Sequence, residues 1–217
     1  MELFIHWALV TAGIISAFTV TVFLVPVVIS IPALLSLRDT PARSAVDGVT
    51  TLDDAASMCR ASGLTGWELV EYARALVSRK MSYSYRNPYD LPARAFERGL
   101  GYCWHKGWAL YELLTRLGFR VQAVQAVKVM FPAGDIEGVR REGGMLGHMW
   151  VRVGIDGMTL DCDPGREDIE TGELFCEPIS PVVPLTPLWS AISYLGSPYV
   201  NSIRYFWWRK EKLKKMK

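Results

Sequence analysis

The chain has 217 residues, of which half are hydrophobic and 21% are charged, with a formal net charge of +2, four Cys and three His. This composition excludes a disordered protein, a disulfide-dense mini-domain and a low-complexity polymer, and the length suits one domain with additional segments. Residues 204–217 carry +6 and the rest of the chain −4, a distribution that argues against a nucleic-acid binder and favours contact with an anionic membrane surface.

The first 37 residues are predicted to form a transmembrane anchor. Residues 3–37 contain no Asp, Glu, Lys or Arg, and a helix of about 20 such residues crosses a bilayer. We expect Pro26 to kink or end this helix, and residues 38–51 to form a polar linker. A buried core helix seldom runs so long without a charge, and a cleavable signal peptide has a basic start and a shorter apolar core. Arg38 and Arg43 follow the span, so the positive-inside rule places the body in the cytoplasm and the protein in the membrane.

Residues 52–177 are predicted to form one domain that starts with helices. Leu52–Ala61 has two Asp in its first turn, and Thr65 precedes Glu68 at the spacing of a capping box, ahead of an apolar stripe over 69–77. The Asn-Pro and Leu-Pro pairs within 87–92 indicate a loop. A further helix is expected over 103–117, ended by a glycine.

The second half of this domain is predicted to be an antiparallel sheet. Phe119–Phe131 alternates and is rich in Val, which indicates a strand, and Pro132–Gly147 reads as a glycine-rich loop. His148–Ile155 and Met158–Cys162 flank Asp-Gly, which is typical of a tight hairpin. Helices followed by antiparallel strands give an α+β fold class, preceded here by the transmembrane helix.

Residues 178–217 are predicted to be a Pro-rich, aromatic and polybasic tail that associates with the membrane. Residues 178–203 are uncharged but contain five Pro, and four aromatic residues at 205–208 come directly before the basic end. This order fits a membrane–water interface. Two alternatives are a solvated, disordered end and a second span over 178–203, which would place the body outside the cell.

One cysteine stands where a thiolate would be stabilised. Cys103 opens the helix predicted over 103–117, and the N–H groups and dipole of a helix N-terminus favour the thiolate. Lys106, one turn further on, would add to this effect if it points toward the thiol. The alternative is that Cys103 is a small buried hydrophobe. His105 is expected to point away from the thiol and to be a poor base for it.

A histidine and two aspartates follow on the predicted hairpin. Alternation places His148 and Trp150 on one face of the first strand, and Asp161 and Asp163 share a face across the turn. A Cys on a helix N-terminus, a His on a strand and an Asp on the next strand are the parts of a nucleophile–base–acid triad. Spacing alone leaves the choice between the two aspartates open.

These segments resemble the transglutaminase-like superfamily, over about residues 50–165. Gly101-Tyr102-Cys103-Trp104 is similar to its cysteine segment, 147–151 to its histidine segment, and Asp163-Pro164 to the end of its aspartate segment. The resemblance implies a papain-like core of N-terminal helices packed on an antiparallel sheet. It also implies that Cys103 is the nucleophile, His148 the base and Asp163 the orienting acid, with Asp161 the competing acid and with Trp104 and Trp150 in support.

The predicted function is that of a membrane-anchored, cysteine-dependent acyl-transfer enzyme that hydrolyses amide or peptide bonds. Two alternatives are a catalytically inactive scaffold that binds a peptide or protein at the membrane, and a transglutaminase that cross-links proteins through glutamine. No cofactor is expected, and no metal site either, because the four Cys show no C-x-x-C pairing. The expected partners are a peptide or protein substrate and membrane lipid, the latter through residues 3–37 and the basic tail; nucleic acid is not expected.

Overall fold

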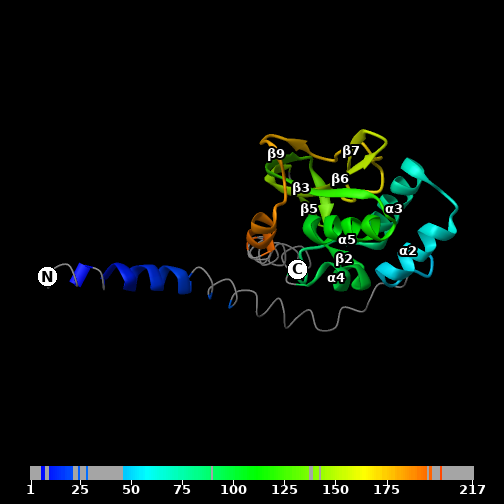
Figure 1. Cartoon of the computed structure of the whole chain (residues 1–217). Helices are drawn as coiled ribbons and strands as arrows, with labels where there is room; N and C mark the ends of the chain where they lie inside the picture. Colours follow the sequence, from blue (N-terminus) through cyan, green and yellow to red (C-terminus); the bar gives the residue numbers. More distant parts are fainter. Residues whose placement is uncertain are drawn as a thin grey trace.

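The computed structural model describes residues 6–7, 10–21, 24, 28, 46–88, 90–136, 139–141, 143–194, 196 and 201. In this part of the chain, helices come first and strands follow, so that the folded body is a mixed α and β structure (Figure 1). The helices are α2 (Leu52–Ala61), α3 (Gly66–Lys80), α4 (Pro92–Arg98) and α5 (Cys103–Arg116).

The helix starts show how far local sequence signals hold. At α2 the predicted first turn is confirmed: Thr51 accepts from the Asp54 N–H at 3.1 Å, and the Asp54 carboxylate accepts from the Thr51 N–H at 2.7 Å. At α3 the helix is present but the predicted capping box is wrong, because the Thr65 side chain makes no cap hydrogen bond. The sequence also missed α4, which begins at Pro92, a residue preorganised for the first helical position.

The main sheet is antiparallel and has the order β7-β6-β3, with β8 and β9 both pairing with the far side of β3. Its strands are β3 (Arg120–Phe131), β6 (Gly144–Ile155), β7 (Met158–Cys162), β8 (Glu177–Pro178) and β9 (Val182–Pro184). The predicted hairpin is confirmed, and its turn residues Asp156 and Gly157 have φ of 49° and 82°, as a tight two-residue turn requires.

The segment predicted as a loop over 132–147 is more ordered than expected. It contains a small hairpin of β4 (Gly134–Ile136) and β5 (Val139–Arg141), and β6 begins at Gly144, four residues before the predicted start. A short parallel pair, β1 (Ser82–Tyr83) with β2 (Leu100–Gly101), leads into α5 and fixes where that helix begins. Strands of two or three residues carry too little periodicity to be read from sequence.

Helix α5 is the centre of the fold, with the sheet on one side and the other helices around it (Figure 1). Its apolar face is buried through Leu110, Leu113 and Leu114, which belong to one cluster with Val151 and Val153 of β6. Removing such side chains from water contributes roughly 1.5–3 kcal/mol each. The start of α5 is therefore held firmly against β3 and β6, where the predicted site residues lie.

The predicted fold class is wrong in its membrane part. Among the residues described, no helix is both long enough and apolar enough to cross a bilayer. The described residues within 3–37 are helical and exposed. Pro26 and the basic tail over 204–217 lie outside the described residues.

Residues after 177 add short strands to the sheet and a helical stretch that contacts it. The predicted boundary between domain and tail falls inside β8, and the Leu185 N–H donates to the Ala123 carbonyl at 2.9 Å. Residues 187–194 are helical, and the Ser193 hydroxyl donates to Gln125 Oε1 at 3.1 Å. This stretch therefore packs against β3, one of the strands beside the start of α5.

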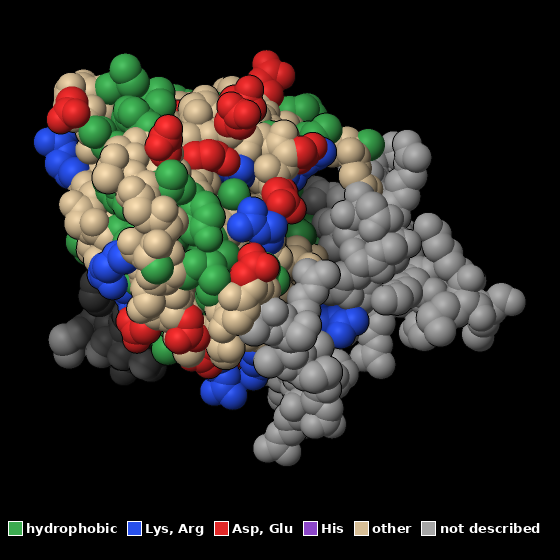
Figure 2. All heavy atoms as spheres, turned by 90° about the vertical axis from the view of Figure 1, so that its right-hand side faces the viewer, with side chains coloured by type: hydrophobic (Ala, Val, Ile, Leu, Met, Phe, Trp, Pro, Cys, Tyr) green, Lys and Arg blue, Asp and Glu red, His purple; other side chains and the backbone are tan. Residues whose placement is uncertain are grey.

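The face of the body turned to the viewer in Figure 2 mixes basic and acidic side chains, with hydrophobic side chains between them. Ion pairs between exposed or partly exposed side chains include those of Arg116 with Asp53 at 2.5 Å and with Glu112 at 3.6 Å. Exposed pairs of this kind contribute little to stability, about 0–1 kcal/mol each. We find no single-sign field on this face that would point to a charged ligand.

Candidate active site

Cys103 is the first residue of α5. Tyr102 is the N-cap, and its side chain makes no cap hydrogen bond. The first N–H groups of α5 have no partner within the helix, so they remain available to a thiolate or to an oxyanion. Cys103 is partly exposed, whereas the other three cysteines are buried.

His148 and Asp163 form a buried pair beside this helix start. His148 lies on β6, and its Nε2 is 2.8 Å from Asp163 Oδ2. The two side chains are 0% and 1% exposed. Asp163 follows β7 directly, so the antiparallel hairpin itself brings the carboxylate next to the imidazole.

The second ring nitrogen of His148 differs from the first in its surroundings. Its Nδ1 is buried and has no hydrogen-bond partner among the described residues. Burial by itself lowers the pKa of His148, but the Asp163 carboxylate and, to a smaller extent, the Cys103 thiol raise that pKa to about 10. His148 is therefore a cation at neutral pH.

The Asp163 carboxylate is oriented by its own turn. Oδ1 accepts from the Gly165 N–H at 2.8 Å, which leaves Oδ2 for His148. The Gly165 carbonyl in turn accepts from the Lys106 ammonium at 3.1 Å. Lys106 thus points toward the aspartate turn, and burial lowers its pKa to about 8. It supports the acid, a role different from the predicted one beside the thiol.

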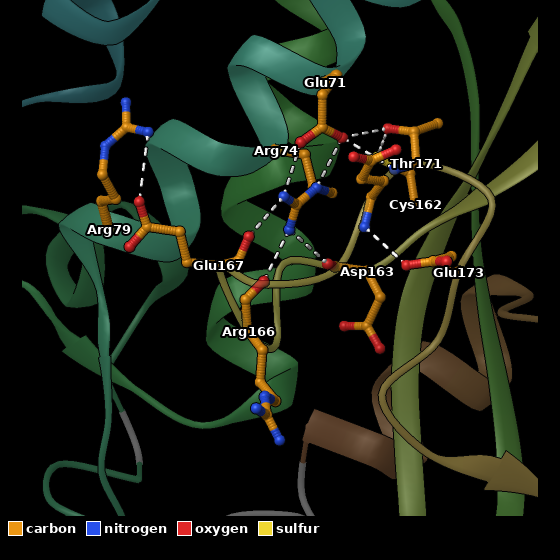
Figure 3. A network of polar contacts seen from close by, with 10 residues as sticks. Glu71, Arg74, Arg79, Cys162, Asp163, Arg166, Glu167, Thr171 and Glu173 are labelled. Carbon is orange, nitrogen blue, oxygen red and sulfur yellow. Dashed lines mark hydrogen bonds and ion pairs between the residues drawn. The ribbon is translucent and has the colours of Figure 1, made fainter.

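A buried arginine holds the same turn from the other side (Figure 3). Arg74 of α3 is 1% exposed, and its guanidinium donates to the carbonyls of Arg166 at 2.7 Å and Glu167 at 3.2 Å. Glu71 neutralises it at 2.7 Å. In Figure 3 the Asp163 carboxylate points away from Arg74, so the arginine fixes the backbone of the turn and leaves the carboxylate to the histidine.

Aromatic rings enclose the His148 imidazole. Trp150 stacks on it with centroids 5.5 Å apart and an interplanar angle of 24°, while Phe131 and Phe175 meet it edge-on at 5.4 and 5.0 Å. Such packing keeps water from the His148–Asp163 hydrogen bond and strengthens it, since the local dielectric is low.

The competing acid, Asp161, is engaged elsewhere. Its Oδ1 accepts from Trp150 Nε1 and from Arg152 Nε, both at 2.8 Å. Asp161 therefore holds the indole that stacks on His148, and the structure brings Asp163, not Asp161, to the imidazole. This also assigns Trp150 its place as a support for the base.

Cys103 and His148 both line a cleft of about 350 Å³. Tyr102 and Trp104 border it from the start of α5, residues 125–127 and 147–149 border it from the sheet, and Trp189, Ile192 and Ser193 border it from the helical stretch 187–194. Trp104 is 6% exposed and packs on Tyr194 at 5.4 Å between ring centroids. The thiol and the imidazole thus meet at a hollow open to a ligand.

The remaining thiols are buried. Desolvation raises the pKa of Cys59 to about 11 and those of Cys162 and Cys176 to about 12, which keeps all three protonated. Ligand atoms of Cys176, His148 and Asp163 lie within 4.8 Å of one another. An ion bound through His148 Nε2 would displace the 2.8 Å hydrogen bond between His148 and Asp163.

His105, expected to point away from the thiol, lies on the opposite side of the helix start. Its Nε2 is 2.9 Å from the Asp90 carbonyl, and its ring packs against Tyr102 at 4.4 Å. Burial lowers the pKa of His105 to about 4, so it is neutral. A β-carbon on Gly101 would lie 2.7 Å from His105 Cβ, which explains why the cysteine segment begins with a glycine.

Sequence reasoning missed Arg74, Phe131, Phe175 and Cys176. The Arg74–Glu71 spacing of three residues on a helix is a signal for an ion pair but not for burial or for its target, a turn 89 or more residues away. The two Phe and Cys176 come from segments that meet only in the folded sheet.

No protein-family model matches the chain, and no curated protein matches it either.

Proposed function

We propose that the protein is a cysteine-dependent acyl-transfer enzyme that hydrolyses amide or peptide bonds, with Cys103 as nucleophile, His148 as base and acid, and Asp163 as orienting carboxylate. The observation that carries the proposal is the buried 2.8 Å contact between His148 Nε2 and Asp163, which leaves the other ring nitrogen for the thiol at the cleft. The resemblance of these segments to the transglutaminase-like superfamily points to the same three roles.

In the first half of the reaction, the Cys103 sulfur would attack the carbonyl carbon of the amide, and the carbonyl oxygen would become an oxyanion. The N–H groups in the first turn of α5 have no acceptor within the helix and are suited to stabilise this charge, and one such donor contributes about 3 kcal/mol to the barrier reduction. His148 would then give its proton to the leaving nitrogen. The C–N bond breaks, the amine departs and a thioester remains on Cys103.

In the second half, His148 would take a proton from water, and the resulting hydroxide equivalent would attack the thioester carbon. The C–S bond breaks, the carboxylic acid leaves, and the proton on His148 restores the ion pair with Cys103. An amine in place of water would give a new amide. We propose hydrolysis because water needs no binding site of its own.

The test is to incubate the full chain with a mixture of synthetic peptides and to identify new termini by mass spectrometry. We expect the wild type to produce new termini and Cys103→Ala to produce none. A thiol-reactive amide mimic should label the wild type at Cys103 and should leave Cys103→Ala unlabelled.

The matched control is Cys59→Ala, which removes a buried thiol in α2 and should keep both activities. Circular dichroism checks that all variants are folded. Equal peptide cleavage or equal labelling by Cys103→Ala and the wild type would contradict the proposal. Addition of a fluorescent amine separates the two outcomes of the second half, since cross-linking would attach it to the acyl product.

A further inference from the structure

We infer that the cleft at Cys103 selects a substrate with a bulky, uncharged apolar side chain next to the scissile carbonyl. This inference rests on the proposed function and adds the class of substrate. The acyl part of a substrate stays attached to Cys103 after the amine has left. It is therefore the part that a cleft opening on this thiol holds through both halves of the reaction.

Among the described residues that line the cleft, we find no acidic side chain and no lysine or arginine that could pair with a charged substrate group. None of the described residues that line it is Asp, Glu, Lys or Arg, and its apolar surface comes from indole and aliphatic groups such as Trp104, Trp189, Ile192 and Val127. A carboxylate or ammonium placed there would lose water without gaining a counter-ion, which disfavours binding strongly. His148, the one titratable lining group besides the tyrosine and the nucleophile, is already paired with Asp163.

The size of the cleft fits one large side chain. Its volume of about 350 Å³ is near the lower end of the ~300–1,000 Å³ typical of ligand pockets. A small side chain would leave part of this apolar surface uncovered, so aromatic and branched aliphatic groups gain most from entering it.

The outer wall is built by the helical stretch 187–194, and it is fixed to the body at two points. Ser193 donates to Gln125 of β3, and Tyr194 packs on Trp104 of α5. Trp189 and Ile192 are nevertheless 46% and 47% exposed. These two side chains form a partly exposed apolar rim. A substrate side chain that enters beside them would bury this rim.

The experiment uses amino-acid chloromethyl ketones that share one reactive group and differ only in the side chain: Phe, Leu, Ala, Lys and Asp. In each, the Cys103 sulfur displaces chloride from the chloromethyl carbon and forms a thioether, so the alkylation rate reports how well the side chain fits. Iodoacetamide, which has no side chain, gives the reference rate. We expect the Phe and Leu reagents to exceed the Lys and Asp reagents at least tenfold after this normalisation.

Two pairs of variants locate the selectivity. Trp189→Ala should lose most of the preference for Phe, whereas Leu188→Ala, an exposed neighbour outside the cleft, should keep it. Val127→Asp places a carboxylate at an exposed position of the lining and should raise the rate of the Lys reagent several-fold. Met130→Asp, on the same strand but outside the lining, should not.

Equal normalised rates for all side chains, or a preference that survives Trp189→Ala and ignores Val127→Asp, would overturn the inference and leave the proposed nucleophile standing. A Cys103 that reacts with none of the reagents, iodoacetamide included, in a folded protein would overturn the proposed function and this inference with it.

Discussion

The two buried histidines lie near the start of α5, and they differ in the group that contacts Nε2. His105 and His148 are 0% and 3% exposed, and in both rings Nε2 is bonded while Nδ1 has no partner among the described residues. Nε2 of His105 meets a carbonyl, and Nε2 of His148 meets a carboxylate. Burial lowers the pKa of both, to about 4 for His105, yet the carboxylate raises that of His148 to about 10.

This difference shows what keeps a buried histidine protonated in this fold. Desolvation disfavours the imidazolium, and a neutral carbonyl only partly compensates for it. A full negative charge reverses the outcome where the fold aims it at the ring. Arg74 and Lys106 hold the backbone of the turn that presents the Asp163 carboxylate. Substitutions of the carboxylate, of the arginine that holds its turn and of each imidazole test this comparison.

The largest effect is expected when the carboxylate becomes an amide. Asp163→Asn should leave His148 with a neutral partner, as His105 has now, and should lower the rate of acyl-enzyme formation on the order of 10⁴-fold. Asp161→Asn removes a charge from Trp150 and Arg152 and should lower the rate by less than about tenfold. Stopped-flow or quenched-flow measurement of the thioester checks both, and a larger loss in Asp161→Asn would reverse the assignment of the acid.

The next effect concerns the turn that presents Asp163. Arg74→Met leaves two carbonyls and Glu71 without their buried cation and should reduce the free energy of unfolding by about 3–5 kcal/mol. Arg79→Met, which breaks an exposed pair with Glu167 at 3.6 Å, should cost less than about 1 kcal/mol. Urea unfolding measures both, and equal losses would show that the buried arginine does not hold the turn.

Per pH unit, the smallest effect is a pH dependence of the free energy of unfolding, which has opposite signs at the two rings. The folded state keeps the His148 proton up to about pH 10, whereas an unfolded histidine releases it near its ordinary pKa of 6.5. The stabilisation is thus complete below pH 6.5 and is lost as the pH rises toward 10, by up to about 1.4 kcal/mol per unit. His105 remains neutral down to about pH 4, so its contribution is lost as the pH falls below 6.5.

Urea unfolding across this pH range tests the assignment of the two signs. His148→Gln should flatten the decline of the unfolding free energy on the alkaline side, and His105→Gln should flatten it on the acid side. If His148→Gln left the alkaline slope unchanged, His148 would not be the group that gains a proton on folding.

Local patterns were enough to predict α2, α5 and the β6–β7 hairpin, because each has a cap, a stripe or a turn within a few residues. Alternation grouped His148 with Trp150 and Asp161 with Asp163 but did not choose between the two aspartates, and the contact of His148 with Asp163 is seen only in the folded hairpin. The predicted transmembrane helix was wrong, since no helix among the described residues is long and apolar enough to cross a bilayer. Arg74, Phe175 and the cleft wall around Trp189 could not be predicted, since their positions depend on packing between segments far apart in the chain.

The coupling between thiol and imidazole is tested most directly by an NMR titration of the histidine rings in the wild type and in Cys103→Ala. We expect the His148 ring to stay protonated above pH 8 in the wild type. Its titration midpoint should fall in Cys103→Ala, because the thiol contributes to the raised pKa of His148. The midpoint of His105 should not change, because the thiol does not contribute to the pKa of that ring. An identical His148 midpoint in the two proteins would contradict the proposed pair.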